Sequence, residues 1–220
     1  MQLRNWLVTH CYHRKSLLDP THNYSVLPTQ LVNQFSGKTI LNIGAGAERV
    51  GEGVITLDLF SGADIKGDAM HLPITSNSVD LVLSIAVLEH LPEPVASITE
   101  MYRILKPGGH IYIEIPFLQP FHSSPHDYYR ATLPGLKHWC RHFQHLKSGV
   151  CVGPGSSVAW IEIEYIKLWV SNISFLALPI EIIFRLWSLP LKWLDRFIIN
   201  SPDAHITASA IYFHGQKPKA

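Results

Sequence analysis

Four short apolar runs in the first half of the chain constrain the fold most strongly. We expect strands at residues 39–43, 54–59, 79–85 and 110–115, which are rich in Val, Ile and Leu. They are apolar at nearly every position, as strands buried on both faces of a parallel sheet are. Parallel strands need long crossover connections, so these runs favour an α/β fold.

The segment between the last two runs has helical periodicity. From 92 to 106, apolar residues recur three or four places apart, at Val95, Ile98, Met101, Tyr102 and Leu105. The sequence KPGG at 106–109 predicts that the helix stops and the chain turns into a strand. A strand, a helix and a strand with short links predict a right-handed crossover in a doubly wound, mostly parallel sheet.

Helices and strands are also expected outside these runs. The lead-in before residue 37 is expected to be helical with breaks at Pro20 and Pro28, and Thr132 is expected to cap a short helix that reaches Phe143. Residues 145–152 should form a strand. The Trp-rich, apolar stretch 156–199 should form two or three helices with breaks at Pro179 and Pro190, before a closing strand at 206–215.

The length of 220 residues suits a single domain with one core. We expect one domain over 1–220 with four parts: a lead-in (1–36), a cofactor-binding core (37–152), an apolar helical cap or insertion (153–205) and the closing strand (206–215).

Charge and cysteine content limit the partners and the compartment. A net charge of +1 without a long basic run argues against a nucleic-acid binder. Three scattered cysteines without a CxxC pair fit a reducing compartment, so a cytoplasmic location is expected. The N-terminus does not resemble a secretory signal, and the most apolar stretch, 168–180, is too short to span a bilayer but apolar enough to lie on one.

The stretch LNIGAGAERVGEGVITLD (41–58) suggests a ligand site. Gly44 and Gly46 directly follow the first expected strand, where glycines let backbone N–H groups approach a ligand. Asp58 ends the next strand, where a carboxylate can accept both hydroxyls of a ribose. Alone, this motif also fits an ordinary turn between a strand and a helix.

Two phosphate-binding alternatives are disfavoured. A dinucleotide fingerprint needs a third glycine, and the chain has Arg49 at that place. A P-loop needs GK[ST], which does not follow.

Together with three motifs downstream, the glycine loop resembles class I S-adenosylmethionine-dependent methyltransferases of the type-11 group. These motifs are GDAMHLP (67–73), SNSVDLVLSIAVLEHL (76–91) and MYRILKPGGHIYIEIP (101–116), and the resemblance covers 38–117. It implies a Rossmann-like, seven-stranded sheet and S-adenosyl-L-methionine as the cofactor.

The resemblance also implies roles for individual residues. The glycine loop would lie at the methionine end of the cofactor, Asp58 at the ribose, Asp68 to Met70 at the adenine and Ser84 to Ala86 beside the sulfonium. Glu89 and His90 would begin the next helix. The implied cofactor-binding residues are Asn42, Gly44, Ala45, Gly46, Asp58, Leu59, Asp68, Ala69, Met70, Ser84 and Ile85.

The chain departs from this family in two ways. Asn42 replaces the acid that usually opens the loop, and Ala47 takes the third small position. Gly44 and Asp58 are 14 places apart (58 − 44), against about 20 in the family. We therefore expect a truncated first helix behind the loop.

A polar and aromatic loop after the fourth run supplies candidate catalytic residues. In PFLQPFHSSPHDYYRAT (116–132), a histidine oriented by an aspartate suits removal of a proton from the methyl acceptor, tyrosines can line a pocket and an arginine can bind an anion. The candidates are His122, His126, Asp127, Tyr128 and Arg130. The alternative is a structural loop in which Asp127 pairs with Arg130. Family members with a similar PHDYYR sequence suggest a glycan or cell-envelope substrate.

Two other features allow several interpretations. His138 and His142 lie one helical turn apart, but no acid accompanies them and we expect no metal. The apolar stretch 165–199 is interpreted as a cap over the substrate pocket, with a membrane-interface helix pair or a dimer surface as alternatives.

The resulting functional hypothesis is methyl transfer from S-adenosyl-L-methionine to a small-molecule, glycan or lipid-linked acceptor, by O-methylation, without a nucleic-acid partner. A catalytically inactive, methyltransferase-like binding protein is the main alternative. A nucleotide-sugar or NAD-binding enzyme is a third, disfavoured by the missing glycine. The acceptor and the oligomeric state are not specified by the sequence.

Overall fold

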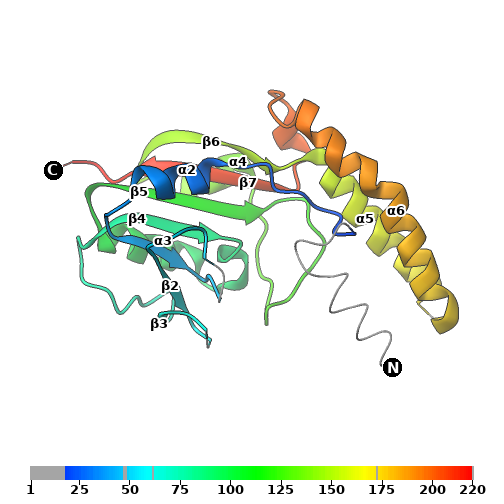
Figure 1. Cartoon of the computed structure of the whole chain (residues 1–220), viewed down its shortest axis with the longest axis horizontal. Coiled ribbons are helices and arrows are strands. Elements are labelled where there is room, and N and C mark those ends of the chain that lie inside the picture. Colours follow the sequence, from blue (N-terminus) through cyan, green and yellow to red (C-terminus); the bar gives the residue numbers. More distant parts are fainter. Residues whose placement is uncertain (1–17, 47–48, 61, 172, 220) are drawn as a thin grey trace. The chain divides into compact units, whose positions relative to one another are not determined.

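The computed structural model describes residues 18–46, 49–60, 62–171 and 173–219 (Figure 1). In this part of the chain, one mixed sheet has the strand order β3-β2-β1-β4-β5-β7-β6. Its strands are β1 (Ile40–Ile43), β2 (Val54–Asp58), β3 (Ile65–Lys66), β4 (Val79–Ile85), β5 (Leu105–Pro116), β6 (Gln144–Val152) and β7 (Ala210–Gln216).

The direction of the strands confirms the doubly wound, mostly parallel sheet. Strands β1 to β5 pair in parallel, and β7 pairs antiparallel with β5. The chain moves outward from β1 through β2 to β3, then returns to place β4 on the other side of β1. The strand order therefore reverses between β1 and β4, and ligands of such sheets bind at that point.

The described helices connect or follow these strands. The α-helices are α2 (Leu27–Gln34), α3 (Pro94–Ile104), α4 (Leu133–Trp139), α5 (Pro154–Val170) and α6 (Ser174–Ile198), and two short 3-10 helices are η1 (Leu88–His90) and η2 (Ala204–Ile206). Of the segment between β1 and β2, the described residues 44–46 and 49–53 contain no helix, as the short spacing predicts.

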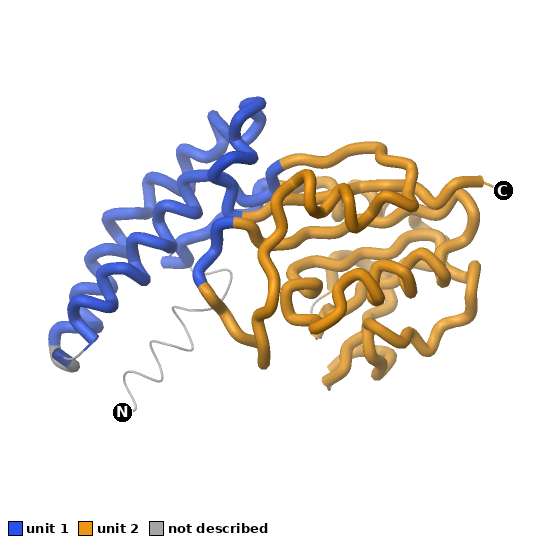
Figure 2. The backbone as a smooth tube through the Cα atoms, turned by 180° about the vertical axis from the view of Figure 1, so that it is seen from behind, with its two compact units in different colours: residues 1–24, 118–120, 150–209 blue, residues 25–117, 121–149, 210–220 orange. Residues whose placement is uncertain are grey.

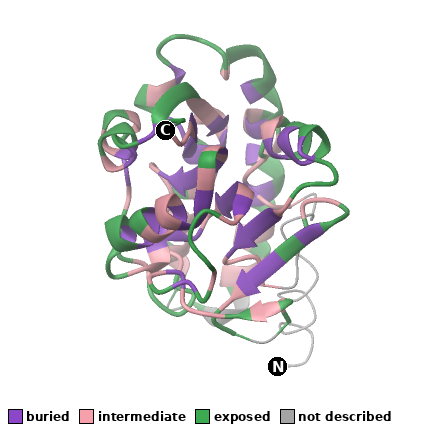
Figure 3. Cartoon of the chain, turned by 90° about the vertical axis from the view of Figure 1, so that its left-hand side faces the viewer, coloured by how far each residue is buried: buried purple, intermediate pink, exposed green. Residues whose placement is uncertain are grey.

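The burial of the central strands explains their sequence pattern. All four residues of β1 are buried, as are most of β4 and the second half of β5 (Figure 3). Ile43, Leu81 and Ile113 are completely inaccessible to solvent. Burial on both faces therefore requires the continuous apolar runs from which these strands were predicted.

Proline positions account for the main errors in the secondary-structure prediction. Helix α6 continues through Pro179 and Pro190, and Pro28 lies in the first turn of α2 rather than at a break. A proline in the first helical turn loses no backbone hydrogen bond, whereas one inside a helix costs about 3 kcal/mol, which tertiary packing must offset. For α6, this packing comes from its antiparallel neighbour α5.

Two further differences concern the edges of strands. Strand β5 begins at Leu105, so KPGG lies inside an irregular strand start, with Gly108 at φ +80°. The two-residue β3 was not predicted, because it is too short to show an alternation of apolar and polar residues.

Thr132 caps α4 as predicted, with its side chain accepting a hydrogen bond from the Gly135 N–H. The helix ends at Trp139, before the predicted end at Phe143.

The chain folds into two compact units (Figure 2). One comprises 25–117, 121–149 and 210–220 and holds most of the sheet. The other comprises 1–24, 118–120 and 150–209 and contains α5 and α6. The expected single domain stays a prediction, and so does the function of 153–205 as a cap. The expected helix in 1–17 lies outside the described residues.

Candidate functional site

The carboxyl ends of β1, β2 and β4 lie side by side in the sheet. In the pairing register, Ile43 is opposite both Leu57 and Ser84. The loops that leave these strands therefore begin at one edge, and they carry the residues expected to bind the cofactor.

The glycine loop has the backbone geometry that glycine favours. Gly44 and Gly46 have positive φ angles of 67° and 55°. The Gly44 N–H donates to the Leu57 carbonyl at 2.7 Å, and the Ala45 N–H lies 3.4 Å from the same oxygen. A Cβ on Gly44 would lie 2.4 Å from a methyl carbon of Val87, whereas one on Gly46 would meet no described residue within 4 Å. Gly44 is therefore needed for packing, and no described residue crowds Gly46.

Asp58 fixes the conformation of this loop. Its Oδ2 accepts a hydrogen bond from the Gly46 N–H at 2.8 Å, and its Oδ1 accepts one from the Phe60 N–H at 2.9 Å. The carboxylate remains partly exposed, and each oxygen keeps a second lone pair for a ligand hydroxyl. Leu59 and Phe60 follow with more than half of their surfaces exposed, at 54% and 57%. An acid beside an exposed apolar surface suits a nucleoside.

The loop after β3 presents a second acid. The Asp68 Oδ1 accepts from the Met70 N–H at 2.8 Å, and its Oδ2 lies 3.4 Å from Nδ1 of His71. Ala69 is buried and Met70 is partly exposed. Asp68 therefore stabilises its own turn, as Asp58 does, while staying at the surface.

Two buried polar atoms lie behind the glycine loop. Asn42 Oδ1 in β1 and Ser84 Oγ in β4 are inaccessible to solvent and have no hydrogen-bond partner among the described residues. Ile85 follows, partly exposed, and Ala86 has φ +54°, which is unusual for a residue other than glycine. Strain and unsatisfied polar groups of this kind concentrate at functional sites.

The second half of the site is the loop between β5 and α4. The Tyr128 N–H donates to the Glu89 carbonyl at 2.7 Å, and the Tyr129 hydroxyl donates to the Pro92 carbonyl at 3.0 Å. The Ala131 N–H donates to the Pro116 carbonyl. The first two bonds attach the loop to the segment that follows β4, and the third attaches it to the end of β5.

Asp127 is the internal anchor of this loop. Its carboxylate, with a side chain 1% exposed, receives two hydrogen bonds from Arg130, at 2.5 and 2.6 Å. It also accepts one from the His122 backbone N–H at 2.8 Å. Burial raises the pKa of Asp127, but the bonds from Arg130 and His122 outweigh this effect and hold the pKa at about 2. The pairing of Asp127 with Arg130, the alternative considered from the sequence, is thus present.

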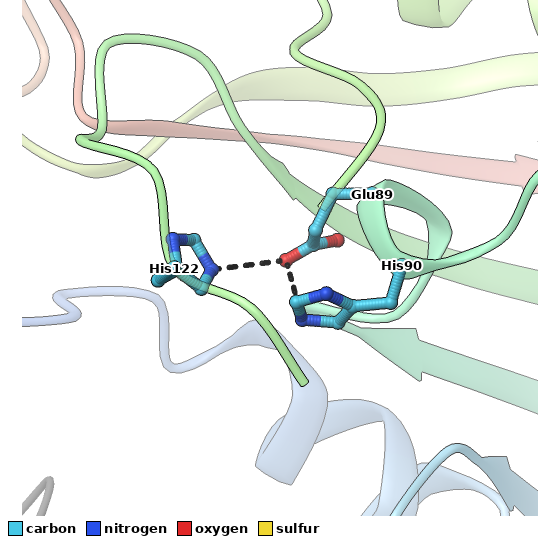
Figure 4. Close-up of side chains that lie close together, drawn as sticks. All are labelled: Glu89, His90 and His122. Carbon is cyan, nitrogen blue, oxygen red and sulfur yellow. Dashed lines mark ion pairs between the residues drawn. The ribbon is translucent and has the colours of Figure 1, made fainter. Parts of the chain in front are cut away.

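Glu89, His90 and His122 converge beside this anchor (Figure 4). The Nε2 atoms of His90 and His122 both lie 3.8 Å from the same Glu89 oxygen. Glu89 is fully buried, and neither of its carboxylate oxygens has a hydrogen-bond partner among the described residues. The sequence pattern assigned Glu89 and His90 only to the start of a helix, although an acid and a histidine a few residues after the end of β4 were a usable signal.

The predicted catalytic residues are therefore only partly brought together. His122, Asp127 and Arg130 contact one another, with Arg130 Nη2 3.4 Å from His122 Nδ1. His126 is exposed and contributes its backbone carbonyl to His90, and Tyr128 is 49% exposed. That His138 and His142 bind no metal stays a prediction.

The sheet and the glycine loop define a class I methyltransferase fold, and comparisons with known proteins agree. The family model described as "Methyltransferase domain" matches residues 45–113. Demethylmenaquinone methyltransferase from Renibacterium salmoninarum is 25% identical over 70% of this chain and 73% of its own. The corresponding enzyme from Lactiplantibacillus plantarum is 46% identical, but only over 21% of this chain and 19% of its own.

A solved structure supports the fold. Phosphoethanolamine N-methyltransferase 2 of Haemonchus contortus, in complex with S-adenosyl-L-methionine, aligns with a TM-score of 0.56 at 16% identity. The alignment covers all of this chain and 60% of that one. The family match identifies residues 45–113 as a methyltransferase domain and supports S-adenosyl-L-methionine as the cofactor, and the solved structure supports the fold.

The residues present fit this cofactor. No described residue occupies the place where a Cβ of Gly46 would project, and Asp58 keeps lone pairs for two ribose hydroxyls. The exposed side chains of Leu59 and Phe60 offer an apolar surface for a base. The assignment of individual contacts to these residues stays a prediction.

Proposed function

We propose that the chain transfers a methyl group from S-adenosyl-L-methionine to an oxygen of a small-molecule, glycan or lipid-linked acceptor. The observation that carries this proposal is the hydrogen bond from the Gly46 N–H to Asp58, which shapes a glycine loop at the reversal point of the sheet. The family match over 45–113 supports the same activity.

The chain's own residues have two tasks in this reaction. The cofactor carries a methyl group on a sulfonium, so the protein must align the acceptor and accept its proton. Asp58 and the glycine loop orient the cofactor. The loop around Asp127 orients the acceptor, and His122 and His126 are the candidate proton acceptors because a histidine can exchange protons near neutral pH.

A lipid-linked acceptor is supported by the helical hairpin α5–α6. Along α6, the buried stripe is polar and consists of Arg185, Ser188, Lys192 and Asp195. The exposed surface includes Trp169 and Trp187, at 69% and 73% exposure. In this hairpin the polar residues of α6 are buried and apolar side chains are exposed to solvent. Such a surface suits a membrane interface, where Trp is favoured.

We therefore propose that this hairpin contacts a membrane surface peripherally. No described helix is long and apolar enough to cross a bilayer. The names of the curated relatives point to demethylmenaquinone as their acceptor, which supports a lipid-soluble acceptor here. Flotation with anionic phospholipid vesicles tests this proposal: the wild type should float, and the double variant Trp169→Ser, Trp187→Ser should not. Equal flotation of both would contradict it.

The proposed activity is tested by methyl transfer from labelled cofactor. Purified protein should label either the aqueous or the lipid fraction of a cell extract, and Asp58→Ala should abolish the labelling. Stability of the label to mild base separates an ether from an ester. If S-adenosylhomocysteine binds but no fraction becomes labelled, the inactive binding protein is the better account.

A further inference from the structure

The cluster of Glu89, His90 and His122 has the composition of a metal site. Glu89 and His90 come from η1 and His122 from the loop after β5, and Figure 4 shows all three side chains pointing toward one point. One potential ligand atom from each lies within 4.8 Å of the other two. The histidine rings are nearly perpendicular, with centroids 5.5 Å apart. All three residues belong to the same compact unit.

The Glu89 carboxylate points to a missing positive charge. Its side chain is fully buried, and the two nearest histidine nitrogens are 3.8 Å away, beyond the ~3.2 Å limit of a hydrogen bond. A buried carboxylate without hydrogen bonds is costly, and native proteins usually pair it or place it on a metal.

The tautomer of His90 supports the same conclusion. Its Nδ1 lies 2.6 Å from the His126 carbonyl oxygen, which can only accept, so Nδ1 carries the proton. In the neutral ring, the Nε2 lone pair then faces the Glu89 oxygen. Two acceptors that face each other repel, and a cation between them would satisfy both.

His122 is held by a second shell of polar groups. Its backbone N–H donates to Asp127, and its Nδ1 lies 3.9 Å from the same Asp127 oxygen and 3.4 Å from Arg130 Nη2. In the neutral ring, Nδ1 accepts from Arg130 and Nε2 carries the proton. Metal binding through Nε2 therefore requires the proton to move to Nδ1, where Asp127 is the nearby carboxylate that can accept it, as in the usual second shell of a ligating imidazole.

We propose that Glu89, His90 and His122 bind a divalent transition-metal ion. Two imidazoles and one carboxylate favour Zn²⁺, Co²⁺, Mn²⁺ or Fe²⁺ over Mg²⁺ and Ca²⁺, which prefer oxygen ligands alone. Bonds of about 2.0–2.2 Å place neighbouring ligand atoms roughly 3–3.5 Å apart. The observed 3.8 Å from Glu89 to each histidine nitrogen requires only a small contraction, and the two histidine nitrogens, which lie within 4.8 Å of each other, must approach as well. Three protein ligands leave coordination positions open.

The role of this ion rests on the proposed methyl transfer. A divalent cation lowers the pKa of a hydroxyl that it coordinates, so the acceptor oxygen loses its proton more readily. The transfer breaks the S–CH₃ bond, forms an O–CH₃ bond and leaves neutral S-adenosylhomocysteine, while the acceptor's proton passes to water. His122 is then a metal ligand, and His126 stays a candidate proton acceptor.

Titration with Co²⁺ alone tests the site directly. Metal-stripped, tag-free wild type should develop a visible absorption band that saturates at one Co²⁺ per chain. His122→Ala and Glu89→Gln should each weaken Co²⁺ binding at least tenfold. The matched control is His142→Ala, an exposed histidine outside the cluster, which should leave the titration unchanged.

Three results would overturn the proposal: no band with the wild type, equal Co²⁺ affinity in His122→Ala, or loss of the band in His142→Ala. If Glu89→Gln does not fold, His122→Ala decides alone. Calorimetry with S-adenosylhomocysteine in the presence of EDTA separates the two proposals. Cofactor binding without a Co²⁺ site contradicts only the metal, whereas a Co²⁺ site without cofactor binding contradicts the methyltransferase.

Discussion

The two halves of the candidate site are built in different ways. The cofactor half uses backbone groups that lie close in sequence: the Gly46 N–H reaches Asp58, 12 residues away. The acceptor half uses side chains from distant segments, since Glu89 and His122 are 33 residues apart (122 − 89). We therefore expect the cofactor to be set by the fold and the acceptor to be set by the loops.

The largest expected effect concerns the packing of the cofactor half. Gly44→Ala should destabilise the fold by roughly 2–5 kcal/mol, because its Cβ would clash with Val87 and its positive φ disfavours alanine. Gly46→Ala has the same backbone strain but no clash, so it should cost about 1–2 kcal/mol. Urea unfolding of both variants measures the difference. Equal losses would show that the contact with Val87 is not decisive.

Asp58→Ala tests the same half through the ligand. We expect the affinity for S-adenosylhomocysteine to fall about 100-fold, because charge-assisted hydrogen bonds contribute about 1.5–3 kcal/mol each. Glu52→Ala, an exposed acid in the same connection, is the matched control and should bind normally. Unchanged affinity in Asp58→Ala would refute its assignment to the ribose.

The acceptor half should respond to the loss of its anchor. Asp127→Asn is expected to reduce stability at pH 7 by about 1–3 kcal/mol, since it removes an acceptor from Arg130 and the His122 N–H. The exposed Asp203→Asn provides the control. If Asp127→Asn is as stable as the wild type at pH 7, the loop is held by its backbone bonds alone.

The same residue gives a pH dependence with a defined sign. The pKa of Asp127 is about 2 in the fold and about 4 in an unfolded chain. Its contribution is therefore complete above pH 4 and is lost as the pH falls through 2. The stability difference between the wild type and Asp127→Asn should narrow over this range in urea titrations, and a constant difference would contradict the assigned cause.

The smallest expected effect is at the helix that follows this loop. Thr132→Ala should cost about 1 kcal/mol, because it removes the side-chain cap on the Gly135 N–H, while Thr132→Ser should keep it. Thermal unfolding of the pair checks this. A larger loss would mean that the acceptor loop depends on α4.

The difference between local and distant contacts also explains what could be predicted from the sequence. Most ends of the buried strands were predicted within one or two residues, because burial on both faces requires a continuous apolar run. The glycine loop with Asp58 was predicted because its residues lie close together in the sequence. The continuation of helix α6 through Pro179 and Pro190 was not predicted, since packing against α5 overrides the tendency of proline to end a helix. The approach of His122 to Glu89 depends on how a loop folds back, which no local pattern records.

Calorimetric titration of the wild type with S-adenosylhomocysteine tests the central claim most directly. The glycine loop, Asp58 and the reversal of the strand order predict saturable binding of one ligand per chain, with micromolar affinity. No heat of binding at high micromolar ligand, from protein shown to be folded, would contradict the claim that this chain is built around that cofactor.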